Sequence, residues 1–283
     1  MARYGLPYQG SKSRIAEWVV SVLPPSHTLV DLFGGGCAVT HCALLSGKWQ
    51  RIVTNDITDS VMVFYAAING EFDGYAACPT REEFQQWRGA DTAMALLHSF
   101  GNDKTTYLWS PELEAVKRPA SLMLTSGSLW ERYQWYHRFC DALLGYLKSA
   151  GEEHGRIGEI ENAERLVHLE RVSRLQGLQG LQGDYRLVVV PEGATVYADP
   201  PYRGTANSAR YGAFDFDAFD AWLGGVDFPV FVSEYDCPPG CVEVAHTERT
   251  TTMSASSTST RTERIFLQER FADTVQIGEP SLF

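Results

Sequence analysis

The sequence predicts an α/β fold, in which one sheet domain is assembled from two separated parts of the chain. Apolar runs typical of strands alternate with helical patterns over the first seventy residues, as in a parallel sheet covered by helices. The alternation then stops, and strand patterns return near residue 185. We therefore expect the sheet domain to comprise residues 1–70 and 176–283, and a mainly helical insert to comprise residues 71–175.

The first part of the sheet domain contains a strand–helix–strand–helix pattern. Residues 28–33 form a short apolar run that ends in glycines, and residues 51–56 form a second run that ends in an acid. Helical patterns follow each run, at 38–45 and 60–68. This order favours parallel strands, because a crossover helix returns the chain to the same edge of the sheet.

The insert is polar and rich in tryptophan. Its periodicity predicts helices at residues 81–87, 92–98 and 129–147, whereas residues 103–128 look like a loop. Leucine or valine recurs every third residue from Leu166 to Leu181, a spacing that drifts around a helix. Glycines in the later triplets weaken a helix by about 1 kcal/mol each. We expect the helix to end near Leu175 and the triplets to form an irregular linker. The aromatic residues of the longer helix, Trp130, Trp135 and Tyr136, are interpreted as helix packing.

Strand patterns return in the last third of the chain. They cover residues 185–190, 195–199, 229–232, 242–244 and 264–267, with the last two suited to a terminal hairpin. Residues 247–262 are rich in serine and threonine, and we expect a mobile loop there. Nearby arginines are either phosphate ligands or solvated charges: Arg249, Arg261 and Arg264.

Composition limits the classes of protein. The net charge of −11 argues against a protein that coats nucleic acid, although a local basic surface remains compatible with it. The six cysteines show no paired framework, and Cys237 and Cys241 lack two further zinc ligands, so we expect reduced thiols and no metal. No apolar run is long enough for a membrane span or a signal peptide, and we expect a cytoplasmic protein.

The tetrapeptide Asp199-Pro200-Pro201-Tyr202 carries the strongest chemical signal. It follows an apolar strand pattern, and ligands of open α/β sheets bind outside the carboxyl ends of strands. A carboxylate and a Pro200 carbonyl can accept both hydrogens of a base amino group, while Tyr202 can stack on a base that has left the duplex. This combination suits methylation of an exocyclic amine. The alternative is a proline turn with a capping acid.

A glycine run provides a second candidate site. In Asp31-Leu32-Phe33-Gly34-Gly35-Gly36, glycines after a strand allow close approach of the backbone to a ligand. The acid Asp56 ends the next strand and can bind ribose hydroxyls. These features suit either a nicotinamide dinucleotide or S-adenosylmethionine and do not discriminate between them.

Taken in order, these segments resemble the Dam-type adenine-specific DNA methyltransferases, in the form often carried by phages and prophages. The segments that carry the resemblance are Tyr8-Gln9-Gly10-Ser11-Lys12, Asp31 to Gly36, Asn55-Asp56, Gly183-Asp184-Tyr185, Asp199 to Tyr202, and Val232-Ser233-Glu234-Tyr235. Cys37 stands where the family usually has the last glycine of its cofactor loop. Residues 75–165 align with nothing in the family, so the resemblance transfers no base-reading residue.

The resemblance implies a Rossmann-like S-adenosylmethionine-dependent methyltransferase fold with a mixed sheet and an inserted target-recognition domain at 71–175. It implies methylation of adenine N6 in double-stranded DNA, in a bacterial or phage-infected cell, with any partner endonuclease unknown. The implied catalytic residues are Asp199, Pro200, Pro201 and Tyr202. The implied cofactor-binding residues are Tyr8, Lys12, Asp31, Phe33, Gly34, Gly35, Gly36, Asp56, Asp184, Tyr185 and Asp199.

Several other functions stay open. The same chemistry serves cytosine N4 or adenine in RNA. A catalytically silent DNA-binding subunit would not need both an intact tetrapeptide and a cofactor loop. A nicotinamide-dependent dehydrogenase would explain the glycine run and Asp56, but not the Pro-Pro-Tyr sequence.

Overall fold

The structure is a computed structural model that describes residues 4–69, 77–150, 177–204, 214–254 and 257–278. The chain divides into two compact units. The first comprises Met1–Tyr4, Lys12–Val61 and Gln176–Phe283, and the second comprises Gly5–Ser11 and Met62–Leu175. Within the described residues, no helix has both the length and the apolar character needed to cross a membrane.

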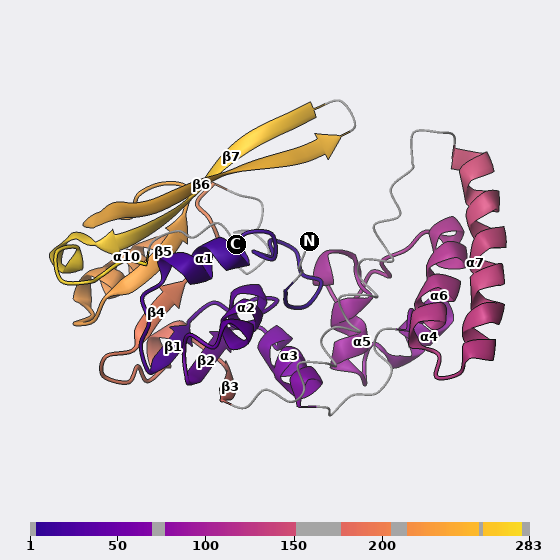
Figure 1. Ribbon diagram of the computed structural model, residues 1–283, viewed down its shortest axis with the longest axis horizontal. Helices are drawn as coiled ribbons and strands as arrows, with labels where there is room; N and C mark the ends of the chain where they lie inside the picture. Colours follow the sequence, from indigo (N-terminus) through magenta and orange to yellow (C-terminus); the bar gives the residue numbers. More distant parts are fainter. Residues whose placement is uncertain (1–3, 70–76, 151–176, 205–213, 255–256, 279–283) are drawn as a thin grey trace. The chain divides into compact units, whose positions relative to one another are not determined.

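The first unit is built on a sheet whose seven described strands have the order β3-β2-β1-β4-β5-β7-β6 (Figure 1). The strands are β1 (Thr28–Asp31), β2 (Arg51–Asp56), β3 (Leu178–Gln182), β4 (Thr195–Ala198), β5 (Val230–Glu234), β6 (Cys241–Ser254) and β7 (Ser257–Gln268). Strands β3, β2, β1, β4 and β5 pair in parallel, whereas β7 is antiparallel to β5 and β6. The predicted mixed α/β sheet is therefore confirmed.

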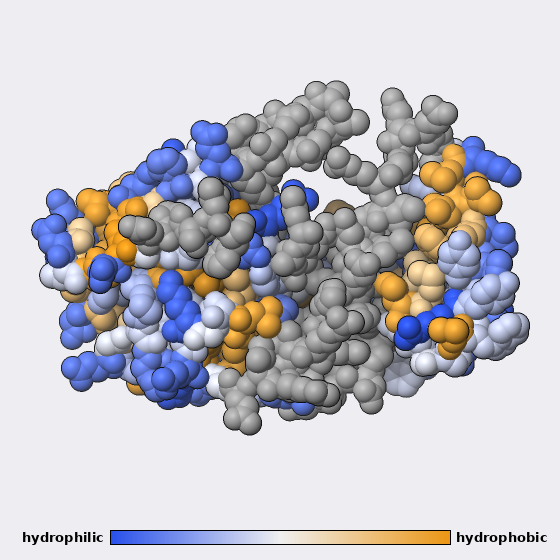
Figure 2. Space-filling view, viewed as in Figure 1, coloured by the Kyte–Doolittle hydropathy of each residue, from blue (hydrophilic) through white to orange (hydrophobic). Residues whose placement is uncertain are grey.

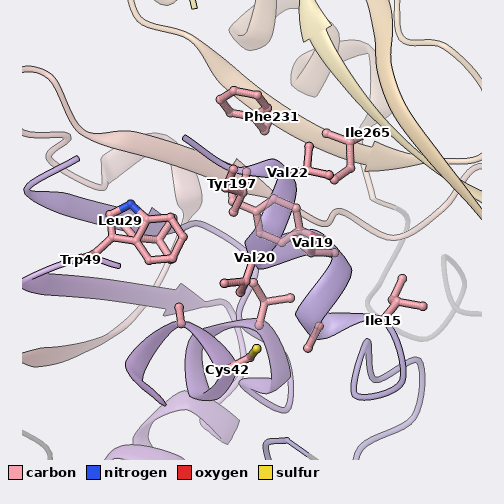
Figure 3. Close-up of a cluster of buried hydrophobic side chains, with 14 of the residues drawn as sticks. Ile15, Val19, Val20, Val22, Leu29, Cys42, Trp49, Tyr197, Phe231 and Ile265 are labelled. Carbon is pink, nitrogen blue, oxygen red and sulfur yellow. The ribbon is translucent and has the colours of Figure 1, made fainter. Parts of the chain in front are cut away.

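Helices bury both faces of this sheet. Leu29 of β1 belongs to a core cluster with α1 (Ala16–Val22) and α2 (Ala38–Ser46), which Figure 3 shows around Tyr197 and Phe231. Its neighbour Val30 belongs to a second cluster with α10 (Phe216–Gly225). Successive side chains of a strand point to opposite faces. Because both faces are covered, the central strands read as continuous apolar runs rather than alternating ones.

Three predictions for the sheet domain are wrong. The Leu-Gln-Gly triplets form no linker, because Leu178–Gln182 is the edge strand β3, with Gly180 paired to Thr54 of β2. Residues 185–190 form no strand, since Asp184 caps the short 3-10 helix Tyr185–Leu187 through its side chain. The predicted loop at 247–262 lies in the long arms of the β6–β7 hairpin, where threonine's β-branching favours extended backbone.

The second unit is helical in its described part. Its helices are α4 (Arg81–Trp87), α5 (Thr92–Leu97), the 3-10 helix Phe100–Asn102, α6 (Pro111–Thr125) and α7 (Leu129–Ala150), and α3 (Ser60–Ile68) leads into it from the first unit. The loop predicted at 103–128 is wrong, because it contains α6. Ser110 caps α6 and Pro111 occupies its first turn, both normal start signals. Pro119 inside the helix disguised the pattern.

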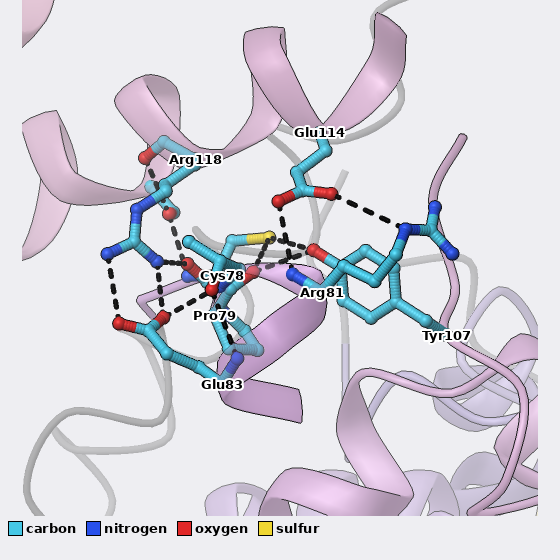
Figure 4. Close-up of polar contacts among 9 residues, drawn as sticks. Cys78, Pro79, Arg81, Glu83, Tyr107, Glu114 and Arg118 are labelled. Carbon is cyan, nitrogen blue, oxygen red and sulfur yellow. Dashed lines mark hydrogen bonds and ion pairs between the residues drawn. The ribbon is translucent and has the colours of Figure 1, made fainter. Parts of the chain in front are cut away.

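A polar network joins α4 to α6 in this unit (Figure 4). Arg118 of α6 lies 2.7 Å from Glu83 of α4, and Glu83 also completes a capping box with Thr80. The Tyr107 hydroxyl donates to the Pro79 carbonyl at 2.6 Å, and Cys78 N–H donates to the Ser121 hydroxyl at 2.8 Å. The polar groups of this network thus satisfy one another.

One face of α7 packs on α6 and the other is exposed. Phe139 is 8% exposed and packs with Val116 and Ala120 of α6. Trp130 and Tyr136, by contrast, are 67% and 50% exposed, so the interpretation of these two residues as helix packing is wrong. Figure 2 shows hydrophobic side chains at the surface in this part of the second unit. Trp130 is nine residues before Phe139, a spacing that places it on the opposite face of α7.

Candidate functional site

Four adjacent parallel strands of the first unit end in carboxylates on one edge of the sheet. Asp31 ends β1, Asp56 ends β2, Asp199 follows β4 and Glu234 ends β5. Because parallel strands carry their carboxyl ends to the same edge, the fold gathers the acids there. This edge is the candidate site.

Lys12 neutralises the central carboxylate. Its ammonium lies 2.8 Å from Asp199 Oδ1, and the two side chains are only 10% and 17% exposed. The same ammonium lies 4.3 Å from the centre of the Tyr202 ring, in a cation–π contact. Burial raises the pKa of Asp199, and the charge of Lys12 opposes that shift. Lys12 therefore favours the ionised form of Asp199, which is the form that accepts hydrogen bonds.

Tyr202 is 8% exposed and is held from several sides. Its hydroxyl donates to Glu263 Oε2 at 3.0 Å, and Glu263 lies on β7. The Tyr235 ring meets it edge-on, with centres 4.4 Å apart and planes at 78°. The ring therefore has a defined orientation beside Asp199.

The residue after the tetrapeptide anchors its loop. Arg203 forms two bonds of 2.7 Å to the Asp220 carboxylate, and its backbone N–H donates to Glu234 Oε2 at 3.3 Å. Burial raises the pKa of Glu234 to about 7, and the negative charge of Asp199 adds to that shift. Both bonds of Arg203 to Asp220 come from one nitrogen, Nη2, and these charge-assisted bonds anchor the loop that follows the tetrapeptide.

The glycine run is held against β2. Gly34 N–H donates to the Asn55 carbonyl at 2.7 Å, and Gly35 N–H donates to Asp56 Oδ2 at 2.8 Å. A Cβ atom on Gly34 would lie 2.4 Å from Thr54 Oγ1, so only glycine fits there. Cys37 adopts a left-handed conformation, with φ of 58°, which explains why the resembling family usually has glycine there.

Asp31 is a buried acid beside this run. It is 1% exposed, and the Thr40 hydroxyl donates to its Oδ2 at 2.7 Å. Burial, with the charges of Asp199 and Asp56, raises the pKa of Asp31 to about 7, although the bond from Thr40 opposes the shift. The edge therefore concentrates negative charge, which suits a ligand that carries positive charge.

Asn55 joins the cofactor segments to one another. Its side-chain amide donates to the Leu32 carbonyl at 3.1 Å and to the Gly183 carbonyl at 3.0 Å. The Phe33 and Tyr185 rings lie 4.9 Å apart and are tilted by 35°. The Asn55 amide thus links the glycine run to the segment at Gly183, which is about 130 residues later in the sequence.

Asp184 has a local partner. Arg186 Nε lies 3.0 Å from both of its carboxylate oxygens, and this pairing lowers the pKa of Asp184. Its side chain also accepts a bond from the Arg186 N–H at 2.9 Å. Asp184 is thus ionised and anchored next to Tyr185.

Most of the predicted site residues come together in the first unit. Tyr8 belongs to the second unit, and its predicted role stays a prediction. Sequence reasoning missed Asn55 and Glu263 as site residues, and it noted Glu234 only within a strand-end motif. Glu263 was not predicted as a site residue because the serine- and threonine-rich stretch before it suggested a mobile loop. Among the described residues, no group of three or more His, Cys, Asp or Glu residues could hold a metal.

The structure describes the side chain of only one of the three arginines that were considered as phosphate ligands. Arg264 donates to the Tyr235 carbonyl at 3.1 Å and lies 3.1 Å from Glu243. Its guanidinium is therefore engaged within the unit. The side chains of Arg249 and Arg261 lie outside the described residues.

The sheet order, the glycine run and the strand-end acids define a Rossmann-like methyltransferase of the α/β class. The family model described as "D12 class N6 adenine-specific DNA methyltransferase" matches residues 8–222. The chain belongs to this family, and its activity is methylation of the N6 amino group of adenine in DNA. The predicted family, fold and activity are thereby confirmed.

No curated protein sequence matches the chain significantly. Among solved structures, the chain is similar to the rRNA methyltransferase aviRa from Streptomyces viridochromogenes, with 12% identity and a TM-score of 0.38. That match covers 93% of this chain and 86% of the other.

Proposed function

We propose that the carboxyl edge of the sheet binds S-adenosylmethionine along β1 and β2, and presents a flipped adenine to Asp199. The observation that carries the proposal is that Lys12 contacts both Asp199 and Tyr202. These two residues follow β4, the strand next to β1. A DNA substrate sets the site of action in the compartment that holds the DNA, which is the cytoplasm in a bacterium.

The residues present fit this cofactor. Gly34 leaves no room for a side chain because Thr54 and Val61 pack against it, so the glycine run lies tightly against the end of β2, next to Asp56. Asp56 already accepts three bonds, one from Gly35 and two from Thr58, and its remaining acceptor site suits a ribose hydroxyl. Asp31 offers negative charge to the methionine part. When bound, S-adenosylmethionine supplies an electrophilic methyl group on a positively charged sulfur.

The tetrapeptide acts on the target base. Asp199 and the Pro200 carbonyl accept the two hydrogens of the adenine amino group, which draws its nitrogen toward a nucleophilic geometry. Tyr202 supplies a stacking surface, which offsets part of the few kcal/mol that base flipping costs. Lys12 favours the ionised form of Asp199, and in that form this carboxylate can also accept the proton that N6 releases after transfer. Positioning then provides most of the acceleration.

The first test is methyl transfer from labelled S-adenosylmethionine to unmethylated double-stranded DNA, followed by analysis of the modified base. We expect N6-methyladenine. Methylated cytosine, or transfer to RNA alone, would favour the alternative substrates. Calorimetry with S-adenosylmethionine, S-adenosylhomocysteine and NAD tests the cofactor, and binding of NAD alone would refute the assignment.

We also propose that the second unit recognises the DNA target. Within its described part, Arg132 and Arg138 are exposed on α7, and the Arg138 guanidinium lies 4.6 Å from the centre of the Trp135 ring. Their replacement by glutamine should weaken DNA binding because phosphate contacts would be lost. It should leave cofactor affinity unchanged, because the proposed contacts along β1 and β2 lie in the other unit. Arg270→Gln, on the first unit, is the matched control. If the α7 variants keep the DNA affinity and the sequence specificity of the wild type, another part of the protein recognises the DNA.

A further inference from the structure

Glu263 is a buried carboxylate that the matched family segment does not reach. It lies on β7, beyond residues 8–222, and is 4% exposed. Tyr202, the last residue of the tetrapeptide, donates its hydroxyl to Glu263 Oε2 at 3.0 Å. A strand that enters the sheet from the far end of the chain thus contacts the proposed base-stacking residue.

A neutral acceptor would be enough to complete the hydrogen bonding of the buried Tyr202 hydroxyl, yet its acceptor is a carboxylate. In the same sheet the buried Tyr197 hydroxyl is satisfied by a neutral partner, the Ser233 hydroxyl, at 2.8 Å. A charged acceptor makes a hydrogen bond roughly twice as strong as a neutral one, yet it costs more to bury. The stronger bond at Tyr202 therefore indicates that the orientation of this side chain matters for the site.

The geometry separates two constraints on the Tyr202 side chain. The hydroxyl oxygen lies on the axis of ring rotation, so a bond to it fixes where the side chain points, which is χ1, and leaves the ring free to turn. The ring's own rotation has a broad, two-fold profile and needs packing to fix it. Tyr235, edge-on at 4.4 Å, supplies that packing. Glu263 and Tyr235 together define the plane and place of the ring.

We propose that Glu263 is a positioning residue that holds Tyr202 in the orientation in which its ring stacks on the target adenine. This role rests on the proposed function, because it assumes that Tyr202 contacts the flipped base. Glu263 touches neither the base nor the cofactor in this scheme, and it acts through the Tyr202 hydroxyl alone.

The test is a double-mutant cycle on single-turnover methyl transfer to unmethylated double-stranded DNA. Glu263→Leu, which removes the acceptor, should lower the rate on the order of a hundredfold, as small misplacements near a reacting centre do. Glu263→Gln keeps a carbonyl acceptor and should lose less than about tenfold. Tyr202→Phe removes the same bond from its other end, and in that background Glu263→Leu should have no further effect.

Two controls separate this role from general damage. Affinity for S-adenosylhomocysteine and the unfolding midpoint should stay near wild type in the Glu263 variants. Ser233→Ala, which removes the partner of the other buried tyrosine, should leave the transfer rate unchanged. If Glu263→Leu does not fold, Tyr202→Phe and Glu263→Gln decide, with a large loss expected only for Tyr202→Phe.

The outcomes that contradict the role are distinct. Equal losses for Glu263→Leu in the wild-type and Tyr202→Phe backgrounds would show that Glu263 acts by another route. Full activity of Tyr202→Phe, or no rescue by glutamine, would also overturn it. A wild-type protein that transfers no methyl to adenine would overturn the proposed function and this role together.

Discussion

Gly34→Ala is the sharpest test of how the glycine run is built. The added Cβ would lie 2.4 Å from Thr54 Oγ1, 3.0 Å from Val61 Cγ2 and 3.4 Å from the Asn55 carbonyl. Ordinary contacts of a Cβ begin near 3.4 Å. The loop or Thr54 must therefore move by about 1 Å. The φ of Gly34 is not in the left-handed region, so the effect is one of space and not of backbone strain.

The expected cost follows from that overlap. Overpacking of a filled interior costs about 1–3 kcal/mol. Replacing glycine by alanine returns about 0.4–1 kcal/mol, because the unfolded chain becomes less free. The net destabilisation should be about 1–2 kcal/mol. Affinity for S-adenosylmethionine should fall about tenfold if the displaced loop loses about 1.4 kcal/mol of binding free energy.

Urea unfolding and calorimetry measure the two quantities. Gly224→Ala is the matched control, because that glycine lies in α10 with nothing within 4 Å of an added Cβ, and it should stabilise by up to about 1 kcal/mol. Adding Thr54→Ala to Gly34→Ala removes the clashing oxygen and should recover part of the loss. Independent, additive effects of the two changes would refute the steric reasoning.

Three other changes test separate features. Asp199→Ala should lower single-turnover transfer on the order of a hundredfold or more while keeping part of the cofactor affinity, and near-wild-type transfer would make Asp199 a turn residue. Asp31 has its pKa raised from 3.8 to about 7 in the folded protein, so its stabilising contribution is complete below about pH 4 and is lost as pH rises through 7. Asp31→Asn should flatten this decline and raise the free energy of unfolding at pH 8. If urea unfolding gives the same fall in unfolding free energy from pH 5 to pH 8 for wild type and Asp31→Asn, the reasoning is wrong. Lys48 donates to the Val20, Ser21 and Leu23 carbonyls at the end of α1, so Lys48→Met should cost about 1–2 kcal/mol of stability without changing transfer. An unchanged thermal unfolding midpoint would refute that capping role.

The sequence predicted the elements whose signals are local. Strands β1 and β2 and helices α2 and α3 follow from apolar runs and helical periods in adjacent residues. The tetrapeptide 199–202 and the glycine run 31–36 carry chemistry in consecutive residues, so they too were visible. These signals depend on few long-range contacts.

The missed features depend on partners far away in the chain. β3 is a strand because Ile52 to Asp56 of β2 offer it a parallel edge, and its own leucine spacing suggested otherwise. The arms of the β6–β7 hairpin support each other through register, which composition does not reveal. Glu263 became a site residue only because β7 pairs with β5, which brings it to Tyr202. The helix α6 was missed because Pro119 has a low helix propensity and lies inside it. The packing of α6 in the folded protein tolerates this proline.

The strand order has a consequence for synthesis on the ribosome. β1 and β2 are made first, but β1 pairs with β4, about 165 residues later, and β2 pairs with β3, about 125 residues later. Gly278 then bonds to the Val22 carbonyl at the end of α1. Contacts of such high sequence separation form slowly, and domains fold as units during translation. The helices α4 to α7 therefore leave the ribosome before β3 and β4, while β1 and β2 can pair only with each other and their outer edges stay unpaired. This waiting period is when nascent chains are most exposed to aggregation, and it makes expression at low temperature or with chaperones the natural choice for producing the enzyme.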